Sequence, residues 1–501
     1  MRRISLIIGC LGAALAALPP SALASTSQES IMQDDGLLLF SGSGQRDATL
    51  DEMRSLGADS VRAFVYWNAV APEATSTQRP PGFDAGAPTS YPSDLWDRYD
   101  GLVRAAAARG LSVILTPTSP IPAWASQCSG SVAKRQSCKP DPALFGGFLR
   151  ALGIRYSGGY ADENEGGRTL PRVSRWGLWN EPSVGRWLTP QFVRREGRIV
   201  PASPARYRQL AIAAIDGLRA TGHASDQILL GETAPFGNTP GAITTRPVAT
   251  ATFWRNLLCI DRSGRSLRGR AAREQDCTRP PRLLATAIAH HPYIRGGSRS
   301  PLTRPRPDEI TIANLPRLQA ILAQGARQGR IAAGLPIYYT EYGFQTNPPD
   351  RELGVPLARQ AEYLNESDWM TYRQPAVKGL AQYLLRDDTG ISGFQSGLKF
   401  ADGRRKPSYD AYRFPVWIVR KGVAVTVFGL VRPASDGASG VVRMQVRLPK
   451  QKQWATLKTV KPNRKGFVLA KFWSRRGSWR LVWEPDSGQQ EISRVAREAN
   501  R

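Results

Sequence analysis

Two glutamates, Glu181 and Glu341, end short apolar segments that have the composition of β-strands. Glu181 ends RWGLWNE (residues 175–181), and Glu341 ends PIYYTE (residues 336–341). Two carboxyl groups about 5 to 5.5 Å apart can cut a glycosidic bond with retention, because one protonates the departing oxygen while the other attacks the anomeric carbon. If both segments end at the same face of one sheet, the two glutamates can form such a pair.

Aromatic residues flank both glutamates. Trp179 comes shortly before Glu181, and Tyr339 and Tyr342 lie on either side of Glu341. Aromatic rings can stack on the C–H faces of sugars, and the burial that they provide raises the pKa of a carboxyl group. These neighbours favour a sugar-binding site.

Arg62 and Glu232 are further candidates. Arg62 lies inside the β-branched segment DSVRAFVYW (residues 59–67), where an unpaired buried guanidinium is costly, so an anionic partner is expected. Glu232 ends a strand-like segment, QILLGETA (residues 227–234), and is expected to contact the substrate or the groups behind it. The alternative for Glu181 is a plain surface turn, because the Asn and Pro beside it are common in turns.

A repeated strand-and-helix pattern positions these residues. Amphipathic segments such as 94–110 and 203–222 separate strand candidates, and both end in Gly, as helices often do. Strand followed by helix predicts parallel pairing and an α/β fold, here a (β/α)8 TIM barrel whose active site lies at the carboxyl ends of the strands. The alternative, an open doubly wound sheet, lacks a Gly-x-Gly-x-x-Gly motif after its first strand. The strand candidates are residues 37–42, 59–67, 111–118, 175–182, 227–234, 284–293, 336–343 and 379–387.

The pattern changes in the C-terminal part of the chain. Residues 416–485 contain short alternating stretches and turns rich in Gly, Pro, Asp and Asn, which predicts a small antiparallel β-sandwich domain. Residues 486–501 are polar and are expected to form a frayed tail. Trp454, Trp473 and Trp479 leave two roles open for the sandwich, a carbohydrate-binding module or a domain packed on the side of the barrel. The packed domain is favoured, because alternating aromatic residues usually fill a sandwich core.

Residues 1–24 predict a secretory signal peptide. Two arginines precede an apolar stretch, and Ala-Leu-Ala at residues 22–24 provides a cleavage pattern. The mature chain then begins near Ser25, residues 25–415 form the barrel domain, and the protein is expected to be secreted or extracellular. A lipoprotein signal ending at Cys10 is disfavoured, because Cys10 lies in the middle of the apolar stretch. No later segment is long enough to span a membrane.

The cysteines predict disulfides. Loss of Cys10 with the signal leaves four of the five, an even number in a chain bound for an oxidising compartment. Cys128 and Cys138 lie close in sequence, as do Cys259 and Cys277, which favours these local pairs; four free thiols are the alternative. No Cys-x-x-Cys motif or His/Cys cluster points to a metal, and neither a metal nor a cofactor is expected.

The chain is strongly basic. Its formal charge is +27, which falls by two to +25 when the arginines of the signal are removed. Such a charge attracts polyanions and makes an acidic or cell-surface glycan a candidate partner. The arginines are scattered and no nucleic-acid-binding module is recognisable, so a solvated basic surface is favoured over nucleic-acid binding. No motif of an esterase, zinc protease or phosphotransferase is present, and a soluble monomer is expected.

These residues resemble the pattern of glycoside hydrolase clan A, in which Asn-Glu-Pro ends strand four and a second glutamate ends strand seven. The chain has Asn180-Glu181-Pro182 and Glu341 at these places, and the resemblance extends from about Gly36 to Pro415. Within the clan, the chain is most similar to cellulase-like and family thirty-nine-like secreted bacterial enzymes. The resemblance implies that Glu181 is the general acid/base, Glu341 the nucleophile and Asn180 the donor to the sugar hydroxyl beside the attacked carbon.

The clan also implies neighbours for the nucleophile. Arg62 matches an arginine on strand two, and His291 and Tyr293 in HHPY match a His/Tyr pair near strand six, with His291 favoured over the histidine before it. Many clan members have a Trp at the end of strand eight. This chain has GLAQYLL there, so Tyr383 or Gln382 would have to serve.

The leading hypothesis is therefore a retaining glycoside hydrolase that cleaves a polysaccharide or oligosaccharide by double displacement with two glutamates. The alternative is a non-catalytic glycan-binding or cell-wall-associated protein on the same scaffold. The basic charge and the replaced Trp motivate this alternative, because a groove can bind sugar without cutting it.

Overall fold

The computed structural model describes residues 27–237, 241–295, 299–390, 392–433, 440–486 and 488–500. The expected signal peptide and Cys10 lie outside the described residues. Within the described ranges, no helix combines the length and the apolar character needed to cross a membrane.

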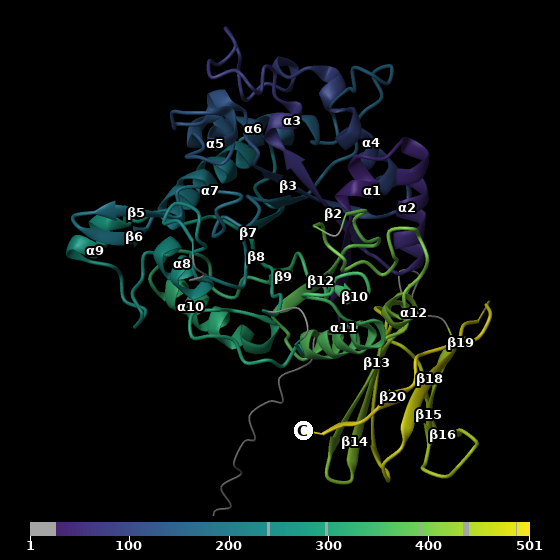
Figure 1. The fold of residues 1–501 in the computed structure, drawn as a ribbon. Coiled ribbons are helices and arrows are strands. Elements are labelled where there is room, and N and C mark those ends of the chain that lie inside the picture. Colours follow the sequence, from purple (N-terminus) through teal and green to yellow (C-terminus); the bar gives the residue numbers. More distant parts are fainter. Residues whose placement is uncertain are drawn as a thin grey trace, which may run out of the picture.

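Parallel strands close into an eight-membered barrel, and helices surround it (Figure 1). In ring order the barrel is β1-β12-β9-β8-β7-β4-β3-β2, with each strand hydrogen-bonded to the next. The (β/α)8 fold expected from the sequence is confirmed. The barrel strands are β1 (Glu29–Gln33), β2 (Ser60–Tyr66), β3 (Ser112–Thr118), β4 (Arg175–Gly177), β7 (Gln227–Thr233), β8 (Ala287–His290), β9 (Ile337–Tyr339) and β12 (Val377–Tyr383).

The first barrel strand differs from the expected one. The sequence pattern places it at residues 37–42, whereas the structure places β1 before this segment, and helix α1 (Asp35–Leu39) overlaps the first half of the segment. The Asp34 side chain accepts a hydrogen bond from Leu37 N at 3.1 Å and so caps α1. A short apolar run has the same composition in a buried strand and in a buried helix, so its pattern alone does not separate the two.

The two segments predicted to be amphipathic helices form α4 (Asp97–Ala108) and α7 (Ser203–Arg219). Gly110 and Gly222, which follow them, have φ angles of 69° and 84°, a left-handed conformation that suits glycine and ends a helix. The other α-helices and the short strands around the barrel are α2 (Ser43–Ser55), α3 (Trp67–Val70), α5 (Val132–Arg135), α6 (Pro142–Arg155), α8 (Thr250–Leu257), α9 (Gly269–Glu274), α10 (Leu315–Arg327), α11 (Leu357–Tyr372), α12 (Pro407–Arg413), β5 (Phe192–Arg195), β6 (Arg198–Pro201), β10 (Thr346–Asn347) and β11 (Val355–Pro356).

The C-terminal part forms two sheets, ordered β17-β14-β13-β21 and β16-β15-β18-β19, with β20 also beside β18. The last residues are not a frayed tail, because β19 and β20 pair with β18, and β21 pairs with β13. In this segment, Glu498 accepts hydrogen bonds from Arg420 Nη2 at 2.7 Å and from Trp479 Nε1 at 2.9 Å. Its carboxylate is therefore paired with groups of the sandwich. The strands are β13 (Val416–Lys421), β14 (Ala424–Leu430), β15 (Val441–Arg447), β16 (Ala455–Val460), β17 (Phe467–Trp473), β18 (Ser478–Glu484), β19 (Glu491–Ile492), β20 (Ala496–Arg497) and β21 (Ala499–Asn500).

The sandwich packs beside α11 and α12 (Figure 1). Phe428 and Phe467 of the sandwich form one buried cluster with Trp369 and Tyr372 of α11. Arg432 Nη2 also donates to Asp368 Oδ1 at 3.0 Å across this contact, and both side chains are buried. The sandwich is thus joined to the barrel by an apolar and partly charged interface.

The tryptophans of the sandwich have different environments. Trp479 lies in its core, Trp454 lies beneath the guanidinium groups of Arg447 and Arg480, and Trp473 is 81% exposed. Of these three, Trp479 fills the core in the way expected of alternating aromatic residues, and Trp483 of β18 lies in the same core.

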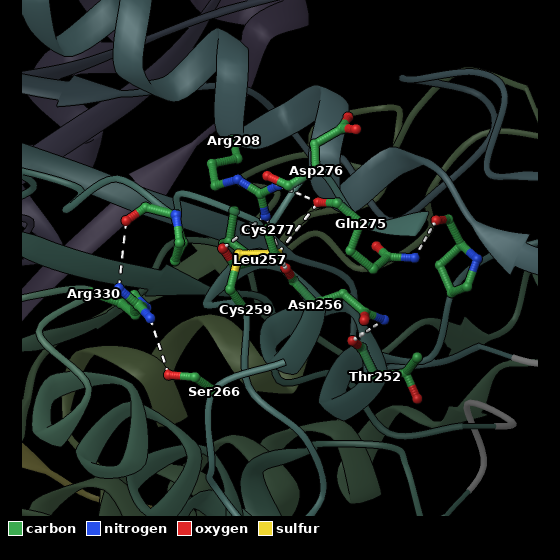
Figure 2. The surroundings of a disulfide bond; sticks show 12 residues. Arg208, Thr252, Asn256, Leu257, Cys259, Ser266, Gln275, Asp276, Cys277 and Arg330 are labelled. Carbon is green, nitrogen blue, oxygen red and sulfur yellow. Dashed lines mark hydrogen bonds between the residues drawn. A yellow bond between two sulfur atoms is a disulfide. The ribbon is translucent and has the colours of Figure 1, made fainter. Parts of the chain in front are cut away.

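Two disulfides join the cysteines that are close in sequence, Cys128 with Cys138 and Cys259 with Cys277. The expected local pairing is confirmed. Figure 2 shows that Arg208 of α7 reaches both ends of the segment closed by the second disulfide. Its Nη1 donates to the carbonyl of Asn256 at 2.9 Å, and its Nη2 donates to the carbonyl of Asp276 at 3.1 Å. The cross-link and the arginine together fix this long loop to the barrel.

Replacing Cys259 and Cys277 together by Ser is expected to lower the free energy of unfolding by about 3 kcal/mol, because the unfolded chain regains the entropy of an open loop. Urea unfolding followed by far-UV circular dichroism measures this. The matched control is the double replacement of Cys128 and Cys138 by Ser. This opens a shorter loop and should lower the free energy of unfolding by slightly less. An unchanged urea midpoint for the first variant would contradict a stabilising role.

Candidate active site

The two glutamates lie at the mouth of the barrel, in the wall of one cavity of about 470 Å³. Glu181 follows β4 and Glu341 follows β9, and the ring order places β7 and β8 between these strands. One carboxylate oxygen of each glutamate and one ring nitrogen of His291 all lie within 4.8 Å of one another. The two carboxyl groups are therefore close enough to reach one sugar.

The backbone at this edge of the barrel is strained. Glu181 and Glu232 have φ angles of 37° and 44°, in the left-handed region that residues with a Cβ rarely adopt. Such a conformation costs about 1 to 3 kcal/mol and persists only where the surroundings enforce it, most often at functional sites. Glu181 N donates to the carbonyl of Glu232 at 3.1 Å, which ties the two strained residues together.

A buried arginine holds Glu341. Arg62 lies on β2 with no exposed surface, and its Nη1 donates to Glu341 Oε1 at 2.8 Å and also to Gln33. Its Nη2 donates to Asn180 Oδ1 at 3.0 Å and also to Glu232. The anionic partners expected for Arg62 are thus two carboxylates, and the guanidinium fixes where each one lies.

His291 and Tyr293 lie on the other side of the glutamates. Tyr293 Oη donates to Glu341 Oε2 at 3.2 Å. His291 Nδ1 lies 3.1 Å from Glu181 Oε1 and 3.6 Å from Glu341 Oε2. His290 is separate from the site, because it is buried and its Nε2 donates to a backbone carbonyl at 2.9 Å. The preference for His291 over His290 agrees with these positions.

Burial sets the protonation of Glu181 and His291. It raises the pKa of Glu181 to about 7, although the positive charge of Arg62 acts in the opposite direction. It lowers the pKa of His291 to about 3, although the neighbouring charge of Glu341 opposes this. A carboxyl group that is still protonated near neutral pH can act as an acid, and a neutral imidazole with its proton on Nδ1 can donate to the carboxylate beside it.

Asn180, Tyr293 and Tyr383 also line the cavity. Because Asn180 Oδ1 accepts from Arg62, the amide nitrogen of Asn180 remains for a ligand. Tyr383 ends β12, the eighth strand in sequence order, where the clan pattern would place a Trp. Gln382 does not reach the cavity, because its side chain donates to two backbone carbonyls at 2.9 and 3.0 Å. Of Gln382 and Tyr383, Tyr383 is therefore the one that lines the cavity at the end of β12.

The structure contradicts the expected substrate contact of Trp179 and decides between the two roles left open for Glu232. Trp179 has no exposed surface, because its ring packs edge-on against Phe145 of α6, in the helix layer. Glu232 also has no exposed surface, since it lies behind the cavity between Arg62 and Thr116. Neither side chain can touch a ligand in the cavity.

Sequence reasoning missed Gln33, Tyr66, Arg186 and Trp187. Gln33 ends β1, and it was missed because the sequence pattern placed the first strand later in the chain. Tyr66 ends β2 and lines the cavity, a position that the strand pattern could have identified. Arg186 and Trp187 lie in the loop after Glu181 and also line the cavity, but no periodic signal marks a loop residue.

Among the described residues, Glu181, His291 and Glu341 also form a group whose spacing could hold a metal ion. One imidazole and two carboxylates are a donor set that Zn²⁺ or Fe²⁺ accepts. A bound metal would occupy the lone pairs that a carboxylate nucleophile needs. These side chains cannot bind a metal and act as the catalytic carboxyl pair at the same time. Removal of metal from the protein therefore distinguishes the two roles.

The fold resembles those of solved glycoside hydrolases. A family 39 glycoside hydrolase from the gut symbiont Bacteroides cellulosilyticus aligns with 90% of this chain and 80% of its own, at 14% identity and a TM-score of 0.50. The GH5_18 protein from Streptomyces cattleya, in complex with GlcNAc, aligns with 78% of this chain and 79% of its own, at 16% identity and a TM-score of 0.48. By sequence, no family model and no curated protein matches the chain. The likeness to the family 39 enzyme shows that the two proteins share the barrel fold.

Arg62→Met is expected to lower the free energy of unfolding by about 3 to 5 kcal/mol, because it leaves Glu232 and Glu341 buried without their cation. The matched control is Arg327→Met, at the exposed last position of α10, which should change stability by less than about 0.5 kcal/mol. Urea unfolding measures both. Equal effects of the two substitutions would contradict the role given to Arg62.

Proposed function

We propose that the protein is a secreted retaining glycoside hydrolase that cleaves a polysaccharide or oligosaccharide with Glu181 and Glu341. The observation that carries this proposal is the closeness of the two carboxylates in the wall of one cavity, where one oxygen of Glu181 lies within 4.8 Å of one oxygen of Glu341. Retaining enzymes need their two carboxyl groups about 5 to 5.5 Å apart, whereas inverting enzymes leave room for a water at about 6.5 to 9.5 Å.

In the first step, Glu341 attacks the anomeric carbon while Glu181 gives its proton to the departing oxygen. Glu341 suits the role of nucleophile, because Arg62 and Tyr293 donate to its two oxygens at 2.8 and 3.2 Å and so fix its orientation. Glu181 suits the role of acid, because burial raises its pKa to about 7. A covalent glycosyl ester on Glu341 results.

In the second step, Glu181 is a carboxylate and takes a proton from water, which attacks the ester and releases the sugar with its original configuration. His291 Nδ1, at 3.1 Å, can donate to Glu181 in this charged state. Asn180 would hold the sugar hydroxyl beside the attacked carbon, and Tyr383 would contact the sugar from the wall of the cavity. No metal or organic cofactor takes part in either step.

The two disulfides among the described residues fit an extracellular enzyme. The formal charge of +27 favours an acidic or cell-surface glycan as the substrate.

Glu341→Ala is expected to abolish turnover on a responsive glycan, because no ester can form. Glu181→Ala should reduce the rate by about 10²- to 10⁴-fold on natural glycans, but by much less on glycosides whose leaving group needs no proton. Added azide should restore part of the Glu181→Ala rate, because an anionic nucleophile needs no general base. Product release from glycans and from nitrophenyl glycosides measures these effects.

Near wild-type turnover by either variant would contradict the assigned roles. Glycan binding without product from a broad polysaccharide panel would instead favour the non-catalytic alternative. Treatment with EDTA should leave turnover unchanged, and a loss that Zn²⁺ restores would show that the three side chains hold a metal.

The rate should fall as the pH rises through about 7, because Glu181 must be protonated in the first step and burial raises its pKa to about 7. The pH profile of kcat/KM, which reports groups of the free enzyme, measures this. Glu181→Gln cannot lose a proton, so its residual rate on nitrophenyl glycosides should not change over the same range. If the rate of Glu181→Gln fell in the same way, the fall above pH 7 would come from the titration of a group other than Glu181.

A further inference from the structure

The catalytic cavity continues on both sides of the two glutamates. A second hollow of about 420 Å³ shares Tyr66, Arg186 and Trp187 with it. A third hollow of about 140 Å³ shares Ile294 and Arg295 with it. The cavity is therefore the middle part of a groove made of three adjoining hollows.

The two outer hollows lie on opposite sides of the barrel mouth. The second hollow is lined by the end of β2 and by the loops that follow β3 and β4, whereas the third is lined by the loop that follows β8. In the ring order of the barrel, β2 and β8 stand opposite each other. The groove thus runs across the mouth, with the carboxylate pair between its ends.

Arginines line both ends of the groove. Arg186 is exposed on one side, and Arg299, Arg304 and Arg306 are exposed on the other. None of these four forms an ion pair with another described residue, whereas Arg295 beside the last three is paired with a buried glutamate at 2.8 Å. Both ends therefore offer positive charge that the protein itself does not neutralise.

The chemistry of these walls matches an acidic sugar chain. The planar guanidinium group binds carboxylate and sulfate groups through two parallel hydrogen bonds. The second hollow also contains aromatic surface, from Trp187 and from Phe40, which is 55% exposed. Such rings can stack on the C–H faces of sugars between the charged contacts.

We propose that the groove binds an acidic polysaccharide on both sides of the carboxylate pair, so that the enzyme cuts bonds inside the chain instead of releasing sugars from its end. This inference rests on the proposed function and adds the chemical class of the substrate and the mode of cleavage. The negative groups, carboxylate or sulfate, contact Arg186 on one side of the cut bond and the arginines of the β8 loop on the other.

Binding is tested with Glu341→Gln, which cannot form the glycosyl ester. Affinity electrophoresis compares polygalacturonate, alginate and hyaluronan as carboxylated polymers, dextran sulfate as a sulfated polymer, and dextran as a neutral one. At least one acidic polymer should bind far more tightly than dextran, and the comparison shows which acidic group is recognised. Equal affinity for dextran and for every acidic polymer would overturn the proposal.

Arg186→Gln and Arg304→Gln, each added to Glu341→Gln, should weaken binding of the preferred polymer roughly tenfold, because each removes a charge-assisted contact. Arg327→Gln removes the same charge from the far end of α10 and should leave the affinity unchanged. An equal loss in all three variants would show that the net charge of the protein, and not the groove, holds the polymer.

Product sizes from the wild-type protein separate this inference from the proposed function. Internal cleavage should give a rapid fall in viscosity and a mixture of oligosaccharides. Release of only a terminal sugar would overturn the inference and leave the proposed function standing. Arginine-dependent binding without cleavage of any polymer would instead contradict the proposed function.

Discussion

The buried guanidinium of Arg62 is the interaction on which the site depends. Its partners Gln33, Asn180, Glu232 and Glu341 come from β1, the loop after β4, β7 and the loop after β9, and Arg62 itself lies on β2. A buried charge is costly unless it is paired, so this network is satisfied only when the strands close in the observed order. Barrel closure and the placement of the two carboxylates thus depend on each other.

Much of the barrel and the positions of the two glutamates at its mouth could be predicted from the sequence. The alternation of apolar strands and amphipathic helices defines a parallel sheet, and a carboxylate at the end of such a strand must lie at the barrel mouth. Arg62 was identified because a guanidinium within a β-branched run needs an anion. These predictions succeeded because each rests on a local pattern with a strong energetic consequence.

The remaining features could not be read from local patterns. The segment Asp35–Leu39 is a helix because one side chain, Asp34, caps it, and apolar composition does not reveal this. Trp179 faces the helix layer, although it lies only two residues from Glu181, because β4 ends at Gly177 and the backbone at both residues is no longer that of a strand. Arg186 lies in the groove because of the path of the long loop after β4, and the path of a loop cannot be predicted from sequence periodicity.

The most direct test of the central claim is to trap the glycosyl ester. A panel of 2-fluoro glycosides with good leaving groups is incubated with the protein, and the modified residue is located by intact mass and peptide mapping. One sugar per chain is expected, attached to Glu341, and no label is expected in Glu341→Gln. A label on Glu181 or Glu232, or a labelled Glu341→Gln variant, would contradict the central claim.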